Sequence, residues 1–305
     1  THNCKISVTD NASNTSDNLS VNTFTIGAIT PALAEVTPVP TLDNDTTPSY
    51  TFFSTLPGSI SYGGDCRDNN TPTAVAGNNA ITFNDLADET YSNCKISVDN
   101  NSNTSDNLSV SSFTIDKTAP TLDNVTIASD NTLNTTLAKT GDNITLSITS
   151  SETLLNRPIV KIAGKNVTET GDNITWSAVY TMASNDSDNV SVSLSISFSD
   201  LAGNPGSAVT STTDGSAVWF DKTAPTLSSV TIASNNSVST MAKTGDNITL
   251  SITSSEAIQT PIVLIAGQAA TETGDNITWS AVYTMASNDS EELVSLNIGF
   301  SDLAG

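Results

Sequence analysis

The stretch Asp116-Lys117-Thr118-Ala119-Pro120-Thr121-Leu122 decides the fold, because it returns one small domain later as Asp221-Lys222-Thr223-Ala224-Pro225-Thr226-Leu227. The residues after each copy also match: Gly-Asp-Asn-Ile-Thr-Leu-Ser-Ile-Thr stands at 141–149 and again at 245–253. Self-similarity at a long, fixed period is typical of an array of like domains. Proline fixes its own backbone and restricts the residue before it, so the Ala-Pro pair in each copy predicts a short, extended connector.

Apolar and hydroxyl side chains alternate in the residues between the two connectors. Ile144, Leu146 and Ile148 fall on one face of an extended chain, while Thr145 and Ser147 fall on the other. The runs that read this way are 125–127, 144–148, 159–162, 174–180, 190–198 and 217–220. One buried and one solvated face is the pattern of antiparallel sheets, and this many short strands in one repeat predicts an all-β, Greek-key β-sandwich.

A second pair of matching stretches divides the rest of the chain. The run Asn-Cys-Lys-Ile-Ser-Val stands at 3–8 and at 93–98, and the β-like run 19–26 resembles 108–115. These matches predict four parts: the last strands of a partial domain (1–27), a complete domain (28–115), a second complete domain (116–220) and a domain without its last strand (221–305). Both ends fall inside a domain, so we expect a window of a longer repetitive polypeptide.

Composition limits the partners. Lys and Arg total 10 against 32 Asp and Glu, which gives a formal net charge of −22. Such a surface repels nucleic-acid phosphates and anionic membranes, and it attracts divalent cations. No apolar run is long enough to span a bilayer. We therefore expect neither nucleic-acid binding nor membrane insertion in this stretch.

The three cysteines predict one disulfide. Cys66 and Cys94 lie in the same predicted domain beside strands, and Cys4 aligns with Cys94, so its partner is expected upstream. A Cys66–Cys94 bridge contributes roughly 3 kcal/mol through the smaller entropy of the unfolded chain. Two buried free thiols are the alternative. A disulfide indicates an oxidising compartment, and hence an extracellular location.

Acidic and amide residues gather at the predicted domain junctions and suggest calcium. A spacing of Asp-x-x-x-Asn precedes each connector, each connector begins with Asp, and each later domain has a Thr-Ser-Ser-Glu turn. Calcium prefers six to eight oxygen ligands. The candidate ligands are Asp99, Asn103, Asp116, Glu152, Asp200, Asn204, Asp221 and Glu256. The alternative is that Asp and Asn stand there because they favour turns.

Other motifs concern the surface. Asn-x-Ser/Thr sequons make Asn124, Asn143, Asn173, Asn247 and Asn276 candidate glycosylation sites. Three tryptophans, Trp176, Trp219 and Trp279, are interpreted as core or sandwich-end aromatics, with carbohydrate stacking as the alternative. Trp176 is in phase with Ile174 and Ala178, which places all three on the apolar face.

Catalysis is not expected. The single histidine is His2, and the chain has no nucleophile elbow, phosphate-binding glycine loop or metalloprotease helix. We predict that the protein is not an enzyme.

The residues 116–220 and 221–305 resemble bacterial immunoglobulin-like repeats of giant surface adhesins, through the Asp-x-Thr-Ala-Pro-Thr connector and the turn Phe198-Ser199-Asp200-Leu201-Ala202-Gly203-Asn204. Residues 28–115 resemble a companion immunoglobulin-like module. The stretches that carry this second resemblance are 47–52, 62–66, 87–94 and 113–116. The resemblance implies tandem immunoglobulin-like sandwiches in an extracellular stalk that interdomain calcium makes rigid. The sequence departs from the pattern at Asn101-Ser102, where the family has Ala-Gly.

Three functions follow as hypotheses. The first is a structural extender of a repetitive surface or fibre-forming protein, which supports adhesion or matrix assembly and whose partners are neighbouring copies or domains. The second is an immunoglobulin-like module that binds a surface glycan or a protein target. The third is a filament subunit joined to its neighbours by strand exchange.

Overall fold

The computed structural model describes residues 4–21, 27, 29–67 and 71–305. The chain divides into two compact units, Thr1–Thr118 with Ala202–Asn204 and Ala119–Leu201 with Pro205–Gly305. Every regular element in the described residues is a β-strand, which confirms the all-β prediction. None of the described residues forms a helix of the length and apolar character that a membrane crossing requires.

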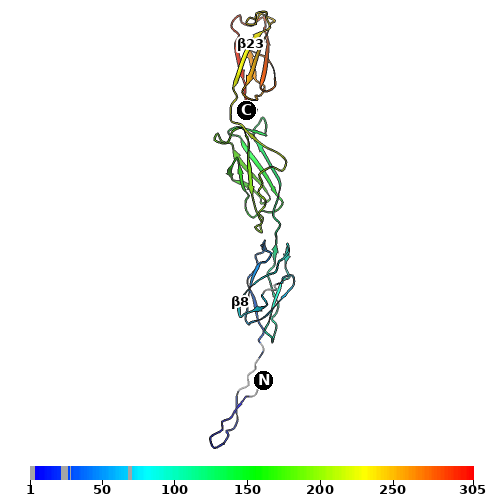
Figure 1. The fold of residues 1–305 in the computed structure, drawn as a ribbon, viewed down its shortest axis with the longest axis vertical. Helices are drawn as coiled ribbons and strands as arrows, with labels where there is room; N and C mark the ends of the chain where they lie inside the picture. The colour runs from blue at the N-terminus through cyan, green and yellow to red at the C-terminus, as the bar shows by residue number, and fades with distance from the viewer. Residues whose placement is uncertain (1–3, 22–26, 28, 68–70) are drawn as a thin grey trace. The chain divides into compact units, whose positions relative to one another are not determined.

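The first unit contains one β-sandwich, which includes β8 in Figure 1. Its first layer has the strand order β3 (Leu33–Thr37), β5 (Ser49–Ser54) and β8 (Gly77–Thr82). Two sheets build the second layer: β11 (Leu108–Ser109), β10 (Lys95–Asp99), β6 (Gly58–Gly63) and β7 (Thr73–Ala74); and β4 (Leu42–Asp43), β12 (Phe113–Ile115) and β9 (Glu89–Tyr91).

The core of this sandwich forms from alternate residues of its strands. Tyr50 and Phe52 of β5 are buried, as are Ile96 and Val98 of β10. The predicted disulfide between Cys66 and Cys94 is present, with a Cα–Cα distance of 5.0 Å, and both cysteines lie in this core. Among the described residues Cys4 is the free cysteine, and it is exposed.

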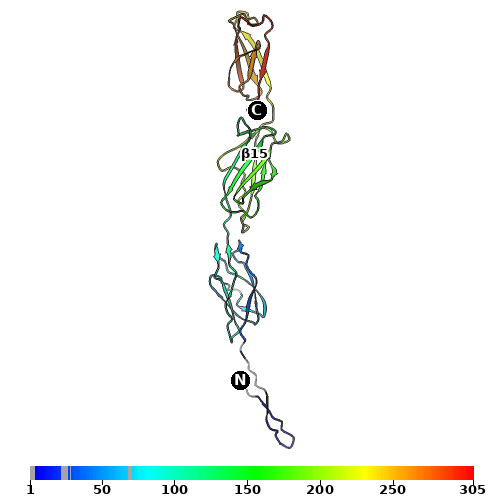
Figure 2. The ribbon, with the colours of Figure 1, turned by 180° about the vertical axis from the view of Figure 1, so that it is seen from behind.

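The second unit begins with a sandwich whose first layer has the order β13 (Leu122–Ser129), β15 (Asn143–Ser150), β19 (Thr175–Thr181) and β18 (Glu169–Gly171). Figure 2 labels β15 within this layer. The facing strands are β14 (Leu137–Ala138), β16 (Ile159–Ile162), β17 (Lys165–Val167), β20 (Val190–Ser191), β21 (Leu194–Ser197) and β22 (Trp219–Phe220). Ile144, Leu146 and Ile148 all face the core with at most 1% of each side chain exposed.

The connections in this sandwich are those of the immunoglobulin-like Greek key. The last strand, β22, pairs in parallel with the early strand β14 and antiparallel with β20, so strands far apart in sequence lie side by side. In the first unit β12 pairs in the same way with β4 and β9. The predicted fold class, tandem immunoglobulin-like sandwiches, is therefore confirmed.

A further sandwich in the second unit repeats the first layer. It has the order β23 (Leu227–Ser234), β24 (Asn247–Ser254), β28 (Thr278–Thr284) and β27 (Thr271–Gly274). Its second layer contains β26 (Gln268–Ala269), β25 (Ile262–Ile265) and β29 (Leu296–Gly299). Among the described residues no strand stands in the place that β22 occupies in the sister sandwich.

The prediction of a single nine-residue strand at 190–198 is wrong in one respect. It is two strands, because the hydrogen-bonding partner changes at Val192 and Ser193: β20 pairs with β22, and β21 pairs with β16 on the other side. Near the start of the chain, β1 (Lys5–Ile6) and β2 (Leu19–Ser20) form a hairpin. The predicted strand 19–26 extends into 22–26, which lie outside the described residues.

Two tryptophans are core residues and one is not. Trp176 and Trp279 are buried, whereas Trp219 is 46% exposed and donates its indole N–H to the Asn189 side chain. Ile174, predicted to share the apolar face with Trp176, is 39% exposed because it lies in the turn before β19. An added Cβ at Gly171 would lie 2.6 Å from the Trp176 ring, so this glycine lets the neighbouring strand approach the ring closely.

Candidate functional site

The connector in the second unit is held by an aspartate from the preceding sandwich. Asp188 accepts the backbone N–H of Lys222 at 2.9 Å through Oδ1, and its Oδ2 accepts the Thr223 hydroxyl. The Thr223 hydroxyl, followed by the Lys222 N–H, lowers the pKa of the Asp188 carboxyl. Asp221 accepts the Thr223 N–H at 3.0 Å. These hydrogen bonds therefore hold the connector against the sandwich before it.

The first connector is built in the same way within the first unit. Asp88 accepts the Lys117 N–H at 3.1 Å and the Thr118 hydroxyl at 2.9 Å, and Asp116 accepts the Thr118 N–H at 3.0 Å. Sequence reasoning missed Asp88 and Asp188. They stand 29 and 34 residues before the lysines that they contact, so no fixed spacing relates them.

Four carboxylates lie beside the second connector. Burial first, and then the negative charges of Asp221, Asp302 and Asp188, raise the pKa of the Glu256 carboxyl. Asp302 is buried, lies in a bridge with Ile258, and accepts the Gly305 N–H at 2.6 Å. The structure thus brings the predicted Asp221 and Glu256 together with two acids that were not predicted as ligands, Asp188 and Asp302.

Hydrogen bonds also link the two sandwiches of the second unit at this junction. The Ala304 carbonyl accepts the Asn131 amide at 2.7 Å and the Lys139 ammonium at 3.1 Å. Lys222 donates its ammonium to the carbonyls of Ser184 and Asp186. These lysines bind carbonyl oxygens, and a shallow pocket between them is lined by Lys139, Thr140, Asp221, Lys222, Ala224, Asp302 and Gly305.

The other candidate ligands divide between the two units. In the first unit, Asn204 donates its side-chain amide to the Asp116 carbonyl at 2.8 Å. In the second unit, carboxylate oxygens of Glu152 and Asp200 lie within 4.8 Å of each other, and Asp200 is fully buried. Within the described part of the second unit, no three carboxylates lie this close together.

Asp99 and Asn103 form a turn. The Asp99 carboxylate accepts the Asn101 N–H at 2.7 Å and the Thr104 hydroxyl at 3.0 Å. Asn103 donates its backbone N–H to the side chain of Asn100. Asn101 has a φ of 68°, whereas in the related turn of the second domain the left-handed residue is Gly203. The departure at Asn101-Ser102 thus changes the turn itself, and both oxygens of Asp99 are used within it.

The sequons differ in what the Asn side chain does. Asn143 donates to Asp130 at 2.9 Å and accepts the Thr181 hydroxyl, and Asn247 accepts the Thr284 hydroxyl. Asn173 and Asn276 have φ values of 79° and 75°, which is the left-handed conformation that Asn tolerates in turns. Asn124 is exposed on β13. Glycosylation of these five residues stays a prediction.

Comparisons with known proteins add little to this description. No protein-family model and no curated protein sequence matches the chain. Among solved structures, the I9–I11 tandem from titin is 9% identical, with a TM-score of 0.29 over 89% of this chain and 95% of that one. The titin immunoglobulin tandem A164–A165 is 9% identical, with a TM-score of 0.23 over 59% of this chain and 94% of that one. The plexin A4 extracellular region is also 9% identical, with a TM-score of 0.23 over 85% of this chain and 22% of that one.

Proposed function

We propose that the chain is a structural extender: tandem immunoglobulin-like sandwiches that give length and spacing to a repetitive extracellular protein, in support of adhesion or matrix assembly at a bacterial surface. The repeated connector carries the proposal. In both units an aspartate binds the N–H of the connector lysine and the hydroxyl of its threonine, although the loops that supply this aspartate differ. A connector that is hydrogen-bonded to the sandwich before it in each repeat suits a protein that keeps its successive domains at a fixed spacing.

An extracellular location is part of this proposal. The Cys66–Cys94 disulfide supports it, because such bonds persist in oxidising compartments. The net charge of −22 supports it as well, since a self-repelling surface keeps a long repetitive chain soluble and separate from its neighbours.

We also propose that calcium binds at the second junction. Burial, and after it the negative charges of Asp221 and Asp302, raise the pKa of the Glu256 carboxyl there. A hard divalent cation offsets these charges and prefers the carboxylate and carbonyl oxygens that the junction offers. Among the described residues of this junction no three carboxylates have oxygens within 4.8 Å of one another, so calcium binding is expected to draw them together and stiffen the connector.

A spacer is distinguished from a binding module by exchanging one sandwich for an unrelated one of equal length. With the chain anchored on a bacterial surface and tagged at its outer end, removal of residues 117–221 joins Asp116 to Lys222 without altering the connector. We expect the tag to lie lower by roughly 35–40 Å, because the eight-residue strands span about 27 Å and the extended connector adds about 10 Å. An unrelated rigid sandwich in the same place should restore its height. Super-resolution measurement of tag height tests this.

The same strains test the binding alternative. If adhesion of the displayed chain is lost on deletion and stays lost when the unrelated sandwich restores the height, then residues 117–221 recognise a ligand and the extender proposal is wrong.

A further inference from the structure

The loop after β13 forms a polar socket, made of Asn131, Lys139 and Asp142. Asn131 is 4% exposed, and its Oδ1 accepts the backbone N–H of Leu133 at 2.9 Å. The Asn131 amide donates one hydrogen to Asp142 at 2.8 Å, and Asp142 also accepts the Lys139 N–H at 2.9 Å. A side-chain amide has two hydrogens, so one remains for a partner outside the loop.

A turn of the last sandwich occupies this socket. The Ala304 carbonyl accepts the second hydrogen of the Asn131 amide at 2.7 Å and the Lys139 ammonium at 3.1 Å. Ala304 is 2% exposed. A Cβ added to Gly305 would lie 2.9 Å from the Leu133 side chain, so a glycine lets the turn approach the loop closely. The contact therefore combines two hydrogen bonds, one of them from a charged donor, with a close fit.

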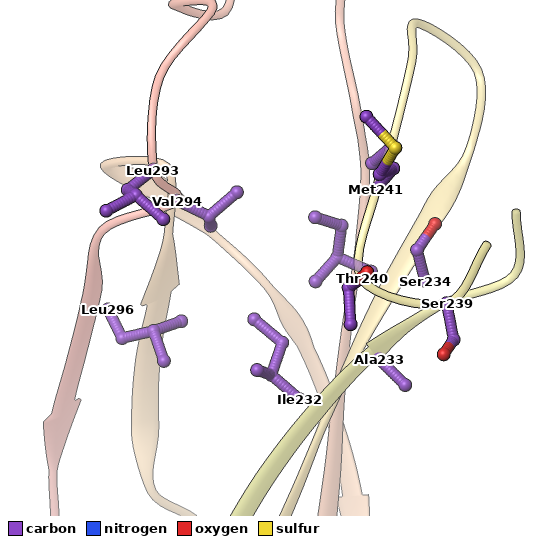
Figure 3. A pocket seen from close by; sticks show the side chains of 11 residues that line it. Ile232, Ala233, Ser234, Ser239, Thr240, Met241, Leu293, Val294 and Leu296 are labelled. Carbon is purple, nitrogen blue, oxygen red and sulfur yellow. The ribbon is translucent and has the colours of Figure 1, made fainter.

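The socket is formed in the same way where no turn fills it. In the last sandwich, Asn236, Lys243 and Asp246 are the counterparts of the three socket residues. Asp246 accepts the Asn236 amide at 2.7 Å and the Lys243 N–H at 2.9 Å, and it is the one acceptor of that amide among the described residues. Figure 3 shows Ser234 and Ser239 side by side, where the N–H of Ser234 donates to the carbonyl of Ser239 and closes the loop. The socket is thus preorganised by its own loop.

The first unit has a related contact. Lys139 follows β14, which pairs in parallel with the last strand of its sandwich, and Asn44 follows β4, which pairs in the same way with β12. A Cβ on Gly305 would lie 3.2 Å from the Lys139 ammonium, and one on Gly203 would lie 3.6 Å from the Asn44 amide nitrogen. Gly203 and Gly305 are the same residue of the repeated Asp-Leu-Ala-Gly turn. In both units, then, the residue after this strand lies against this turn.

We propose that Asn131 and Lys139 form a joint that holds the last sandwich against the middle one without a metal ion. The Lys139 ammonium is a tethered cation, and it binds a carbonyl oxygen of the kind that calcium also prefers. Because both donors belong to the chain, the joint stays closed in chelator and opens when the donors are removed. The inference rests on the proposed extender function for its purpose, whereas the joint itself is measured in the isolated chain.

The distance between two spin labels tests the joint. Asn166→Cys and Ala269→Cys place the labels at equivalent exposed positions of the two sandwiches, in a Cys4→Ser background that keeps the disulfide. In chelator, we expect a narrow distribution of distances for the chain with its socket intact. Asn131→Ala together with Lys139→Met should at least double the width. Lys139→Met alone should broaden the distribution less, since Asn131 still binds the carbonyl.

Asn236→Ala is the matched control, because it removes the same amide from the socket of the last sandwich, where the amide contacts its own loop. It should leave the width unchanged. Lys165→Met, which removes the charge of an exposed lysine in the middle sandwich, should also leave it unchanged. Hydrogen exchange of residues 143–150 shows whether the middle sandwich stays folded in each variant.

A broad distribution for the intact socket in chelator would overturn the proposal, as would an equal width in the Asn131→Ala/Lys139→Met chain. A distribution that narrows in both chains only when calcium is added would assign the joint to the carboxylates and would overturn it as well. A chain that fails the tag-height test but keeps a narrow, socket-dependent distribution would contradict the extender function and leave the joint intact.

Discussion

Removal of the Cys66–Cys94 disulfide is expected to lower the free energy of unfolding of the first sandwich by about 3 kcal/mol, because the reduced chain gains the entropy of an unclosed loop. The two cysteines are 28 residues apart in sequence and both are buried in the core. Alanine at both positions also leaves a small cavity, which adds to the loss. Hydrogen exchange of residues 77–82 and 95–99 in the full chain measures the change.

The rest of the chain supplies the control for this experiment. The sandwiches in the second unit have no cysteine, so exchange of residues 143–150 and 247–254 should stay the same in the Cys66→Ala/Cys94→Ala chain. A Cys4→Ser background prevents the exposed free thiol from linking two molecules. Equal protection of residues 95–99 with and without the disulfide would show that the bond contributes nothing to the stability of the sandwich.

Substitution Glu256→Gln is expected to have opposite effects with and without calcium. The pKa of Glu256 is raised in the folded protein, so its ionisation costs more in the folded state than in the unfolded state. The protein therefore loses stability as pH rises from the ordinary pKa of the carboxyl through the raised one, and the whole penalty is present at neutral pH. Without calcium, Gln removes the penalty and should stabilise the last sandwich by about 0.5 kcal/mol at pH 7.

With calcium, the Glu256→Gln substitution is expected to make the last sandwich less stable than that of the unaltered chain. A ligand at a hundred times its dissociation constant stabilises the state that binds it by about 2.7 kcal/mol. The unaltered chain should gain this stability and the Glu256→Gln chain should gain much less. Thermal unfolding in calcium and in chelator measures both effects. Glu291→Gln, an exposed residue in the same sandwich, provides the same change of charge as a control. An equal response to calcium in the unaltered and Glu256→Gln chains would falsify the junction site.

Much of the fold could be predicted, because the strands that alternate strictly are those with one buried face. Ile144, Leu146 and Ile148 were assigned to the core from period alone, and the repeat carried the same assignment to Ile248, Leu250 and Ile252. The disulfide followed from two cysteines in one repeat. The connector was predicted from its prolines and its recurrence.

The remaining features depend on partners that are distant in sequence. Apolar and polar residues alternate throughout the run 190–198, yet the run forms two strands because its hydrogen-bonding partner changes from β22 to β16. The alternation of side chains does not indicate which strand is the partner. Trp219 is one of three tryptophans expected in the core or at a sandwich end, and it is exposed because Val218 and Phe220 on either side of it take the buried positions.

The junction was predicted only in part, for a related reason. Asp221 and Glu256 stand in repeated motifs, so comparison of the repeats found them. Asp188 lies in a loop whose distance from the connector differs from that of Asp88, and its role becomes visible only when the Lys222 N–H and the Thr223 hydroxyl are in place. Asp99 has the spacing of a ligand, but its carboxylate closes its own turn.

The end-to-end length of single molecules in electron micrographs tests the central claim most directly. The chain is compared in three forms, with residues 117–221 deleted, present once and duplicated, each of which keeps the connector sequence intact. Equal steps of roughly 35–40 Å between the three forms are predicted, since each sandwich adds the length of its eight-residue strands, about 27 Å, and one extended connector of about 10 Å. Three compact particles that grow in diameter without a constant step would contradict the account.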